Sequence, residues 1–312
     1  MMTVSDGLDV LVVGPGAMGC MHAALLGEAG VSCGLLDHRV ERAERINDRG
    51  IIVEREGEQR TVPVRCSADA ADFAPARLAL LLVKAYDTEE ATRHALPALE
   101  DEGGVLTLQN GLGNYERISE IVPPARVLAG TTTFGATLVG EGHVREAGRG
   151  FAQFGSPTGN RRRAREAATF LRSAGIECEP ASSVDEVLWA KAIVNAAINP
   201  LTALTGLRNG RLVEMDALRE LMTAVTEEVA DIARSCGVFV REGIVETVEA
   251  ICEKTAENRS SMLQDVSEGR RTEIEYISGE IARRAKARGL QAPLCDMLTA
   301  LVKGREEAAR GA

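Results

Sequence analysis

A run of glycines near the amino terminus has the residue types and the spacing that bind a phosphate. Gly14-Pro15-Gly16-Ala17-Met18-Gly19 fits G-x-G-x-x-G, follows the apolar run Val10–Val13 and opens a helical pattern. Glycines there allow a tight turn, a close approach of the backbone to a pyrophosphate and close packing of helix on strand, while the helix start presents free N–H groups. Asp37 ends the next apolar run, about 20 residues on, where a carboxylate can meet a ribose. The pattern predicts a dinucleotide site; the alternative is a glycine-rich turn that binds nothing.

A second group of polar side chains recurs at helical spacing further along the chain. Lys191, Asn195 and Asn199 are four residues apart, so they project from one face of a helix. The residues between them are small or apolar, and burying polar groups without partners is costly. This face therefore meets water, forms a structural hydrogen-bond network or binds a ligand, and the spacing alone does not decide between these. Pro200 is expected to end or kink the helix.

The first half of the sequence alternates short apolar runs with helical patterns, as a parallel sheet with crossover helices does. Val10–Val13, a helix over Met18–Glu28 and Val31–Leu36 form a βαβ unit. These patterns predict an α/β fold with a doubly wound sheet. The other predicted elements are the hairpin strands Ile51–Val53 and Val62–Val64 on either side of Glu56-Gly57, strands at Leu78–Val83, Val105–Leu108, Val127–Leu138, His143–Glu146, Phe151–Phe154 and Ile176–Glu179, and a helix over Arg161–Ala174.

The pattern changes after Pro180, because strand signals stop and apolar residues recur at helical spacing nearly to the end. The boundary predicted there divides the chain into domains of residues 1–181 and 182–312. Ser183 and Glu186 have the spacing of a capping box, so a long helix should begin at this point. The second domain is therefore expected to be helical.

Composition and charge restrict the class of protein. The 312 residues are 45% hydrophobic and 26% charged, which is typical of globular proteins. The formal charge of -10 repels polyphosphate, and the basic run Arg161–Arg163 with Arg165 has no interleaved aromatic residues. A solvated helix start is therefore favoured over a nucleic-acid site. The charged tail, Lys303–Ala312, is expected to be frayed.

Neither a metal centre, a disulfide framework nor a membrane span is predicted. The seven cysteines are scattered and odd in number, and the four histidines lack metal-ligand spacing. No run approaches the ~18 consecutive apolar residues of a membrane helix. The first residues show neither a basic region nor a cleavage site. We therefore expect a cytoplasmic protein without metal, nucleic-acid or membrane partners.

Six segments carry further motifs: Gly14–Gly19, Leu82–Ala85, Gln109–Gly113, Gly130–Thr133, Lys191–Gly210 and Ser260–Gly279. In this order they resemble the signatures of the ketopantoate reductase family, and the resemblance extends over nearly the whole chain. It implies a Rossmann-type domain followed by an all-helical domain similar to the carboxyl-terminal domain of 6-phosphogluconate dehydrogenase, with the active site in the cleft between them. It also implies reduction of 2-dehydropantoate (ketopantoate) to pantoate with NADPH, on the route to pantothenate and coenzyme A.

The resemblance implies a role for each residue that matches a family motif. Lys191 is the catalytic lysine, and Glu273 positions the lysine and the substrate. Asn195, Asn199 and Ser261 hold the carboxylate and hydroxyl of the substrate. Lys84, Asn110 and Ala136 match positions on the cofactor side, and Asn110 is expected to face the substrate as well. The expected cofactor site also includes Gly14, Pro15, Gly16, Ala17, Met18, Gly19, Asp37 and Arg39.

The chemistry that the resemblance implies is physically coherent. Hydride addition to a ketone leaves a developing alkoxide, which an ammonium group can stabilise and protonate, and a nearby carboxylate favours the charged lysine. Structural alternatives exist for several residues. Ser261 could cap the next helix, and Glu273 could be the first-turn acid of a capping box that begins at Thr272. Lys84 could be a solvated strand end, and Asn110 a turn residue.

The choice of nicotinamide nucleotide is where the residues and the family disagree. Family members commonly place an arginine after the second strand to meet the 2′-phosphate of NADPH, whereas this sequence has Asp37 there. A carboxylate suits a free ribose hydroxyl and repels a phosphate, which favours NADH. Arg39 could still reach the phosphate. Asp37 leads us to expect that NADH is used at least as well as NADPH.

The sequence thus predicts an NAD(P)H-dependent 2-dehydropantoate 2-reductase that acts on a small-molecule 2-oxo acid. A rival hypothesis keeps the fold and the hydride chemistry but changes the substrate to another branched 2-oxo acid. A remoter rival is a dinucleotide-binding sensor without catalysis, against which the set of Lys191, Asn195, Asn199, Ser261 and Glu273 argues. The assembly that we expect is a homodimer.

Overall fold

The computed structural model describes residues 7–73 and 75–310, and the chain forms two compact units. The first unit comprises Met1–Gln109 and Asn114–Val187, and the second comprises Asn110–Gly113 and Leu188–Ala312. A short segment from the first half of the chain thus belongs to the second unit. The later division falls after Val187, a few residues beyond the predicted boundary at 181/182.

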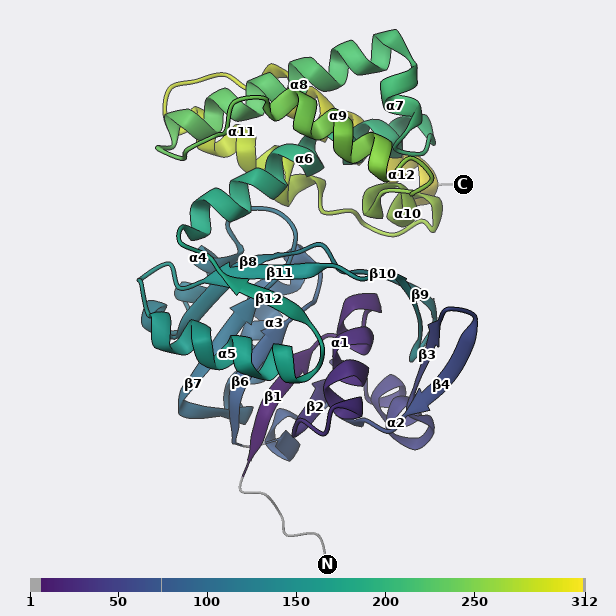
Figure 1. Ribbon diagram of the computed structural model, residues 1–312, viewed down its shortest axis with the longest axis vertical. Coiled ribbons are helices and arrows are strands. Elements are labelled where there is room, and N and C mark those ends of the chain that lie inside the picture. The colour runs from purple at the N-terminus through teal and green to yellow at the C-terminus, as the bar shows by residue number, and fades with distance from the viewer. Residues whose placement is uncertain (1–6, 74, 311–312) are drawn as a thin grey trace, which may run out of the picture. The chain divides into compact units, whose positions relative to one another are not determined.

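The main sheet of the first unit has eight strands: β1 (Leu8–Val13), β2 (Cys33–Leu36), β5 (Arg65–Ser67), β6 (Ala76–Leu81), β7 (Leu99–Thr107), β8 (Val127–Thr132), β11 (Phe151–Gly155) and β12 (Glu177–Pro180). Their order is β12-β11-β8-β7-β6-β1-β2-β5 (Figure 1). The six neighbouring strands β8-β7-β6-β1-β2-β5 are parallel, and β11 is antiparallel to β8. The order β5-β2-β1-β6-β7-β8 is that of a Rossmann-type sheet, and it reverses between β1 and β6. Ligands of such sheets bind beyond the carboxyl ends of the strands at this switch point.

Helices cover both faces of this sheet, because its strands are apolar on both sides. Val10 and Val12 face a core that includes residues of α1, α2 and α5. Leu11 and Val13 face a second core with residues of α3 and α4. The predicted doubly wound α/β fold is therefore confirmed. The helices are α1 (Ala17–Glu28), α2 (Val40–Arg49), α3 (Thr88–Ala95), α4 (Asn114–Ser119) and α5 (Arg161–Ser173).

A separate sheet of four strands, β3 (Ile51–Arg55), β4 (Glu58–Val62), β9 (Gly135–Gly140) and β10 (His143–Gly148), has the order β4-β3-β10-β9. The predicted hairpin is confirmed, since β3 and β4 pair antiparallel around Glu56 and Gly57, both at positive φ. The single strand predicted over Val127–Leu138 is wrong. Thr132 Oγ1 accepts a hydrogen bond from Phe134 N (3.1 Å), and the chain leaves the main sheet in this turn to enter the second sheet as β9.

The second unit is helical, as the spacing of its apolar residues predicts. The capping hydroxyl of Ser183 accepts from Glu186 N (3.3 Å) at the start of α6. Helix α6 continues past Pro200, so this proline does not end it. Over residues 303–310 the predicted fraying of the tail is wrong, because the last helix reaches Arg310 and buries Glu306, and residues 311–312 of that prediction lie outside the described residues. The helices are α6 (Val184–Thr205), α7 (Arg211–Glu214), α8 (Asp216–Ser235), α9 (Ile244–Lys254), α10 (Ser261–Ser267), α11 (Ser278–Lys286) and α12 (Pro293–Arg310).

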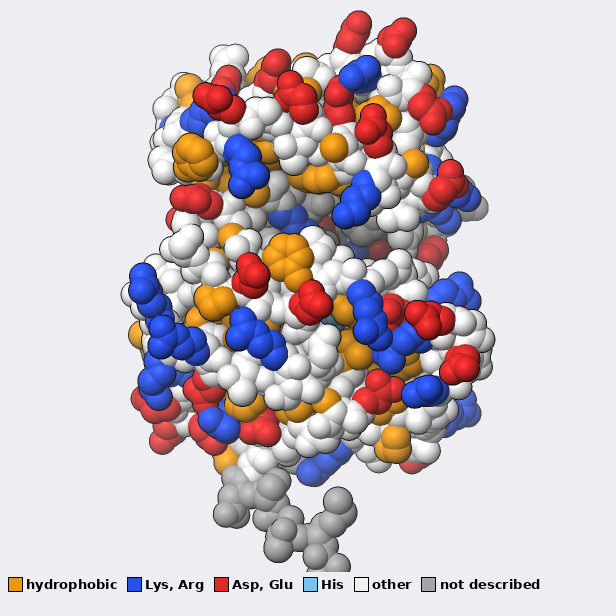
Figure 2. Space-filling view, viewed as in Figure 1, with side chains coloured by type: hydrophobic (Ala, Val, Ile, Leu, Met, Phe, Trp, Pro, Cys, Tyr) orange, Lys and Arg blue, Asp and Glu red, His pale blue; other side chains and the backbone are white. Residues whose placement is uncertain are grey.

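The surface and the composition of the helices bear on the predicted class of protein. Among the described helices, α6 alone is long and apolar enough to cross a membrane by composition, and 67% of its apolar window is buried in the protein. The seven cysteines are free thiols. On the face drawn in Figure 2, acidic and basic side chains are interspersed over the described residues. The basic run does begin helix α5, but Arg163 is only 8% exposed and donates to Glu102 O, so this arginine is not solvated.

Candidate active site

The glycine loop follows β1 and forms a backbone cradle at the switch point of the sheet. Gly14 has a φ of +101° and donates its N–H to Leu36 O (2.9 Å), and a Cβ on it would lie 2.5 Å from Val83 Cγ1. A Cβ on Gly19 would lie 1.8 Å from Gly14 O, so only glycine allows this packing of α1 on the loop. A Cβ on Gly16 would meet nothing within 4 Å. Two glycines are thus required by the fold, and the third leaves open space in front of the loop.

The start of α1 supplies the donors that this open space needs. Gly16 is the N-cap of α1 and has no side chain to bond the first-turn amides. The first N–H groups of a helix have no partners within it, and the helix dipole favours an anion there. Pro15, at the tip, accepts a hydrogen bond from Cys20 Sγ (3.3 Å), which fixes the loop. The residues of the predicted phosphate loop therefore fit a pyrophosphate.

Asp37 lies at the predicted place but its side chain is already engaged. Its Oδ1 accepts from His38 N (2.7 Å) and Arg39 N (3.2 Å), and Arg42 binds both carboxylate oxygens through Nε and Nη2 (2.5 Å each). The side chain of Asp37 is fully inaccessible. Burial raises the pKa of Asp37, but the bonds from Arg42 and from the two amides lower it further, so this pKa lies below its usual value. In this structure the carboxylate anchors α2, and its contact with a ribose stays a prediction.

The remaining cofactor-side residues lie in three places in the first unit. Arg39 is the N-cap of α2, and its guanidinium lies 3.4 Å from Glu141. Lys84 follows β6 and precedes a 3-10 turn at Ala85–Asp87. Ala136 lies on β9 in the four-stranded sheet, opposite Glu146, and packs against the core under α1.

Gln109 is a structural residue of this region that is not among the predicted site residues. It is 6% exposed and links the ends of two strands. Its Nε2 donates to Val83 O and to Thr88 Oγ1 (2.9 Å each), and its Oε1 accepts from Thr107 Oγ1 (2.8 Å). Gln109 thus fixes the chain beside Lys84. Its place in the Gln109–Gly113 motif was the available signal.

The second unit brings together three of the predicted residues. Asn110 Nδ2 lies 3.4 Å from Glu273 Oε2 and donates to it, and Glu273 is only 6% exposed. Burial lowers the pKa of Lys191 from 10.5 to about 8, while the charge of Glu273 acts in the opposite direction. The three side chains come from segments far apart in the sequence. Together they form an acid–base cluster.

Backbone contacts hold Asn110 in this cluster. Leu112 N donates to Tyr276 O (2.9 Å), three residues beyond Glu273. Gly111 has a φ of +89°, and a Cβ on it would lie 2.4 Å from the same oxygen. Gly111 is therefore required for the segment to approach the chain near Tyr276 this closely.

Asn195 and Asn199 share helix α6 with Lys191, one and two turns further on. Asn195 is half-buried and Asn199 is 6% exposed. Within residues 7–73 and 75–310, neither amide side chain makes a hydrogen bond. The two asparagines therefore do not belong to a structural hydrogen-bond network among these residues. Their donors and acceptors are available to a ligand that reaches this face.

Ser261 does not cap the helix that follows it. Ser260 is the N-cap of α10, since its Oγ accepts from Leu263 N (3.0 Å), and Ser261 is the exposed first residue of the helix. Ser260 Oγ also lies 2.6 Å from Thr202 Oγ1 on α6. This buried pair fixes Ser261 near the turn of α6 that follows Asn199.

The capping box suggested for Thr272 and Glu275 is absent. Thr272 N donates to Glu306 Oε1 (2.7 Å) rather than to Glu275, whose carboxylate pairs with Lys303 (2.8 Å). Glu273 precedes a 3-10 turn, Ile274–Tyr276, and makes no capping bond there. Its carboxylate is instead directed to Asn110 and Lys191.

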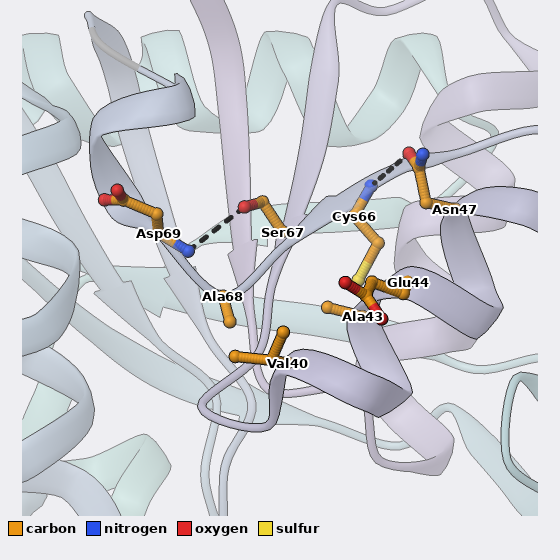
Figure 3. Close-up of a pocket in the computed structure, with 8 residues that line it drawn as sticks. All are labelled: Val40, Ala43, Glu44, Asn47, Cys66, Ser67, Ala68 and Asp69. Carbon is orange, nitrogen blue, oxygen red and sulfur yellow. Dashed lines mark hydrogen bonds between the residues drawn. The ribbon is translucent and has the colours of Figure 1, made fainter.

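A cavity of about 300 Å³ opens between α2 and the end of β5 (Figure 3). Asn47 Oδ1 accepts from Cys66 N (3.3 Å), and Ser67 Oγ accepts from Asp69 N (3.0 Å) along its wall. None of the predicted site residues lines it, and we assign it no role.

Comparison with known proteins matches both units to one protein family. The family models "Ketopantoate reductase PanE/ApbA" and "Ketopantoate reductase PanE/ApbA C terminal" match residues 10–159 and 183–306. The 2-dehydropantoate 2-reductase of Halobacterium salinarum is 38% identical over 95% of this chain and 98% of its own, and that of Archaeoglobus fulgidus is 36% identical over 95% and 97%.

Solved structures agree with this assignment. A PanE/ApbA family ketopantoate reductase from Ralstonia eutropha has a TM-score of 0.87 at 33% identity and covers 96% of this chain and 99% of its own. D-Mandelate dehydrogenase, solved with NADH and anilino(oxo)acetate, has a TM-score of 0.88 at 25% identity and the same coverage. From these matches and the site geometry, the chain belongs to the ketopantoate reductase family.

Proposed function

We propose that this protein is a cytoplasmic 2-dehydropantoate 2-reductase, which reduces ketopantoate to pantoate for pantothenate and coenzyme A. The observation that carries the proposal is the cluster of Lys191, Glu273 and Asn110 on the helical unit, beside the ligand-accessible amides of α6. Mere nucleotide binding needs none of these side chains. We further propose residues 1–181 as the nucleotide domain and 182–312 as the substrate domain.

Lys191 is the proton donor in the proposed reaction. When bound, a reduced nicotinamide would supply the hydride that adds to the ketone carbon. As that carbon gains the hydride, the carbonyl electron pair moves to oxygen, and the ammonium of Lys191 stabilises this oxygen and gives it a proton. With a pKa of about 8, Lys191 is charged at neutral pH and yet is a far stronger acid than a solvated lysine. Solvent returns the proton to Lys191 after the alcohol has formed.

The other residues hold the lysine and the substrate. Glu273 keeps the proton on Lys191 by attraction, and Asn110 fixes one oxygen of Glu273. Asn195, Asn199 and Ser261 bind the carboxylate and the hydroxyl of the 2-oxo acid. None of these residue roles requires a metal ion. The homodimeric assembly stays a prediction.

We propose that the nucleotide is NADPH, against the expectation from Asp37. Its carboxylate is inaccessible and paired with Arg42, so it neither offers itself to a ribose nor carries a free negative charge that would repel a phosphate. Arg39 is about half exposed at the start of α2, where its fork can bind a 2′-phosphate. The glycine loop would hold the pyrophosphate in either nucleotide.

A second candidate function is reduction of a different 2-oxo acid. The similar fold of D-mandelate dehydrogenase, solved with NADH and anilino(oxo)acetate, favours keeping this alternative. The same lysine and amides would serve any 2-oxo acid, because they address the carbonyl and the carboxylate rather than the tail.

The test is a panel of branched, aromatic and short 2-oxo acids assayed with NADPH and with NADH by the absorbance of the reduced nicotinamide. We expect the highest kcat/KM for ketopantoate with NADPH. Higher efficiency with another acid would establish the second candidate, and the absence of turnover with every acid would favour a sensor.

A further inference from the structure

Three arginines at the start of α2 share two carboxylates. Arg39, Arg42 and Arg45 recur every three residues, so they lie on neighbouring turns of one side of the helix. Arg42 is paired with buried Asp37. Arg39 and Arg45 both meet Glu141: Arg39 Nη2 lies 3.4 Å from Oε1, and Arg45 donates from Nε (3.0 Å) and Nη2 (2.6 Å) to Oε2.

Glu141 comes from a different part of the fold, the turn between β9 and β10 of the four-stranded sheet. The bond from Arg45, with the charges of Arg39 and Arg42, lowers the pKa of Glu141, so its carboxylate is charged at neutral pH. A carboxylate bound by two guanidinium groups has the same partners that a phosphate monoester would use. Its side chain is 41% exposed, so it can leave the arginines for water.

We propose that Glu141 is a specificity-determining residue, whose carboxylate competes with the nucleotide 2′-phosphate for Arg39 and Arg45. The inference rests on the proposed NADPH preference. A 2′-phosphate brings between one and two negative charges and three acceptor oxygens, so it displaces a single carboxylate from these arginines. A nucleotide with a free 2′-hydroxyl has no group that needs Arg39, and it binds with the Glu141 pairs intact. Glu141 therefore lowers the affinity for the nucleotide with a 2′-phosphate and leaves the affinity for the nucleotide with a 2′-hydroxyl unchanged.

The turn that carries Glu141 is held without its carboxylate, so the residue can be tested alone. Ile52 N donates to Gly142 O (2.8 Å), and Gly142 lies against the side chain of Ile46 of α2. Glu141→Gln keeps the volume and removes the charge. The control is Glu58→Gln, which removes a carboxylate of the same sheet that is also paired with an arginine, Arg60 (3.6 Å), but is more exposed, at 74% against 41% for Glu141.

The experiment is calorimetric titration of the full-length protein with adenosine 2′,5′-bisphosphate and with 5′-AMP, which needs no turnover. We expect Glu141→Gln to tighten binding of the bisphosphate by about two- to fivefold, the range of exposed ion pairs, and to leave 5′-AMP unchanged. Glu58→Gln should change neither. Equal bisphosphate affinity in wild type and Glu141→Gln, or equal tightening of both ligands, would overturn the inference.

The outcome is separable from the proposed nucleotide preference. That preference is measured as the NADPH to NADH ratio of kcat/KM in the wild type, and it fails if the wild type prefers NADH. A tightening of the bisphosphate in Glu141→Gln would still support the role of Glu141 in that case. Thermal melting of each variant shows that the comparison is made between folded proteins.

Discussion

The predicted sites of the two units differ in composition: one consists of backbone groups and the other of side chains. In the first unit the predicted phosphate loop is made of backbone: Gly14 and Gly19 are required because a Cβ would collide, and Gly16 leaves space in front of the amides of α1. In the second unit the cluster is made of side chains, since Lys191, Glu273 and Asn110 come from three separate segments. A backbone site is contained in one short stretch of sequence, whereas a side-chain site exists only when the chain has folded.

The two kinds of site should therefore fail differently. Substitution in the loop should disturb folding or nucleotide affinity, and substitution in the cluster should leave the protein folded and nucleotide-bound but slow. This difference can be tested by measuring stability, nucleotide binding and turnover on the same variants.

Lys191→Ala should produce the largest effect. Loss of the proton donor is expected to lower kcat by ~10²–10⁴ and leave the Kd of the nucleotide nearly unchanged. Steady-state assays and calorimetry on the same preparation measure both quantities. A variant that kept more than about half of its turnover would contradict the role of Lys191.

Glu273→Gln should have the next largest effect and should change the pH profile. For the wild type, kcat/KM of the reduction is expected to be level at lower pH and to fall as pH rises through about 8, because the protonated lysine is the active form. Removing the carboxylate removes the attraction that raises the pKa of Lys191, so the fall should move to lower pH, with kcat reduced by ~10²-fold through misplacement of the lysine. A lower kcat with an unmoved profile would make Glu273 structural only.

The pair Gly19→Ala and Gly16→Ala separates folding from binding within the loop. Gly19→Ala should destabilise the protein by about 1–3 kcal/mol through overpacking against Gly14 O. Gly16→Ala meets no atom and should cost less than about 1 kcal/mol as an N-cap change. It should nevertheless weaken nucleotide binding by about tenfold, or 1.4 kcal/mol. Melting curves measure the change in stability, and titrations measure the change in nucleotide affinity. Unchanged affinity in Gly16→Ala would show that the loop does not bind the nucleotide.

Asn199→Ala should give an effect no larger than that of Gly16→Ala, and it should be confined to the substrate. Loss of one hydrogen bond to a charged ligand is expected to raise KM for the 2-oxo acid by about tenfold. The Kd of the nucleotide should stay as in the wild type. If the nucleotide titration showed the main loss, Asn199 would belong to the other binding site.

The parts of the molecule that local patterns govern were predictable. Val10–Val13 followed by Gly14–Gly19 indicated both the strand and the loop, and the helical spacing after Pro180 indicated an all-helical unit. The resemblance added Glu273 and Asn110, which no spacing connects to Lys191. The break of Val127–Leu138 into two sheets was missed because threonine is β-branched and favours strands, so the turn formed by the hydroxyl of Thr132 looks like part of one strand.

The side-chain partners at two sites could not be predicted for the same reason. The part that Asp37 plays depends on Arg42, five residues later, which turns the carboxylate into a buried anchor. Thr272 looked like the start of a capping box, but its amide is taken by Glu306 from α12. In each case the competing partner was visible in the sequence, and only the folded chain shows which partner is bound.

The segment Asn110–Gly113 has a consequence for how such a protein can be divided. It belongs to the helical unit, although the chain on both sides of it belongs to the other one. A gene fragment encoding residues 182–312 would therefore lack Asn110, and the carbonyl of Tyr276 would lose the amide of Leu112. The helical unit therefore cannot be transferred between proteins as one contiguous segment, because the transferred sequence must also include residues 110–113.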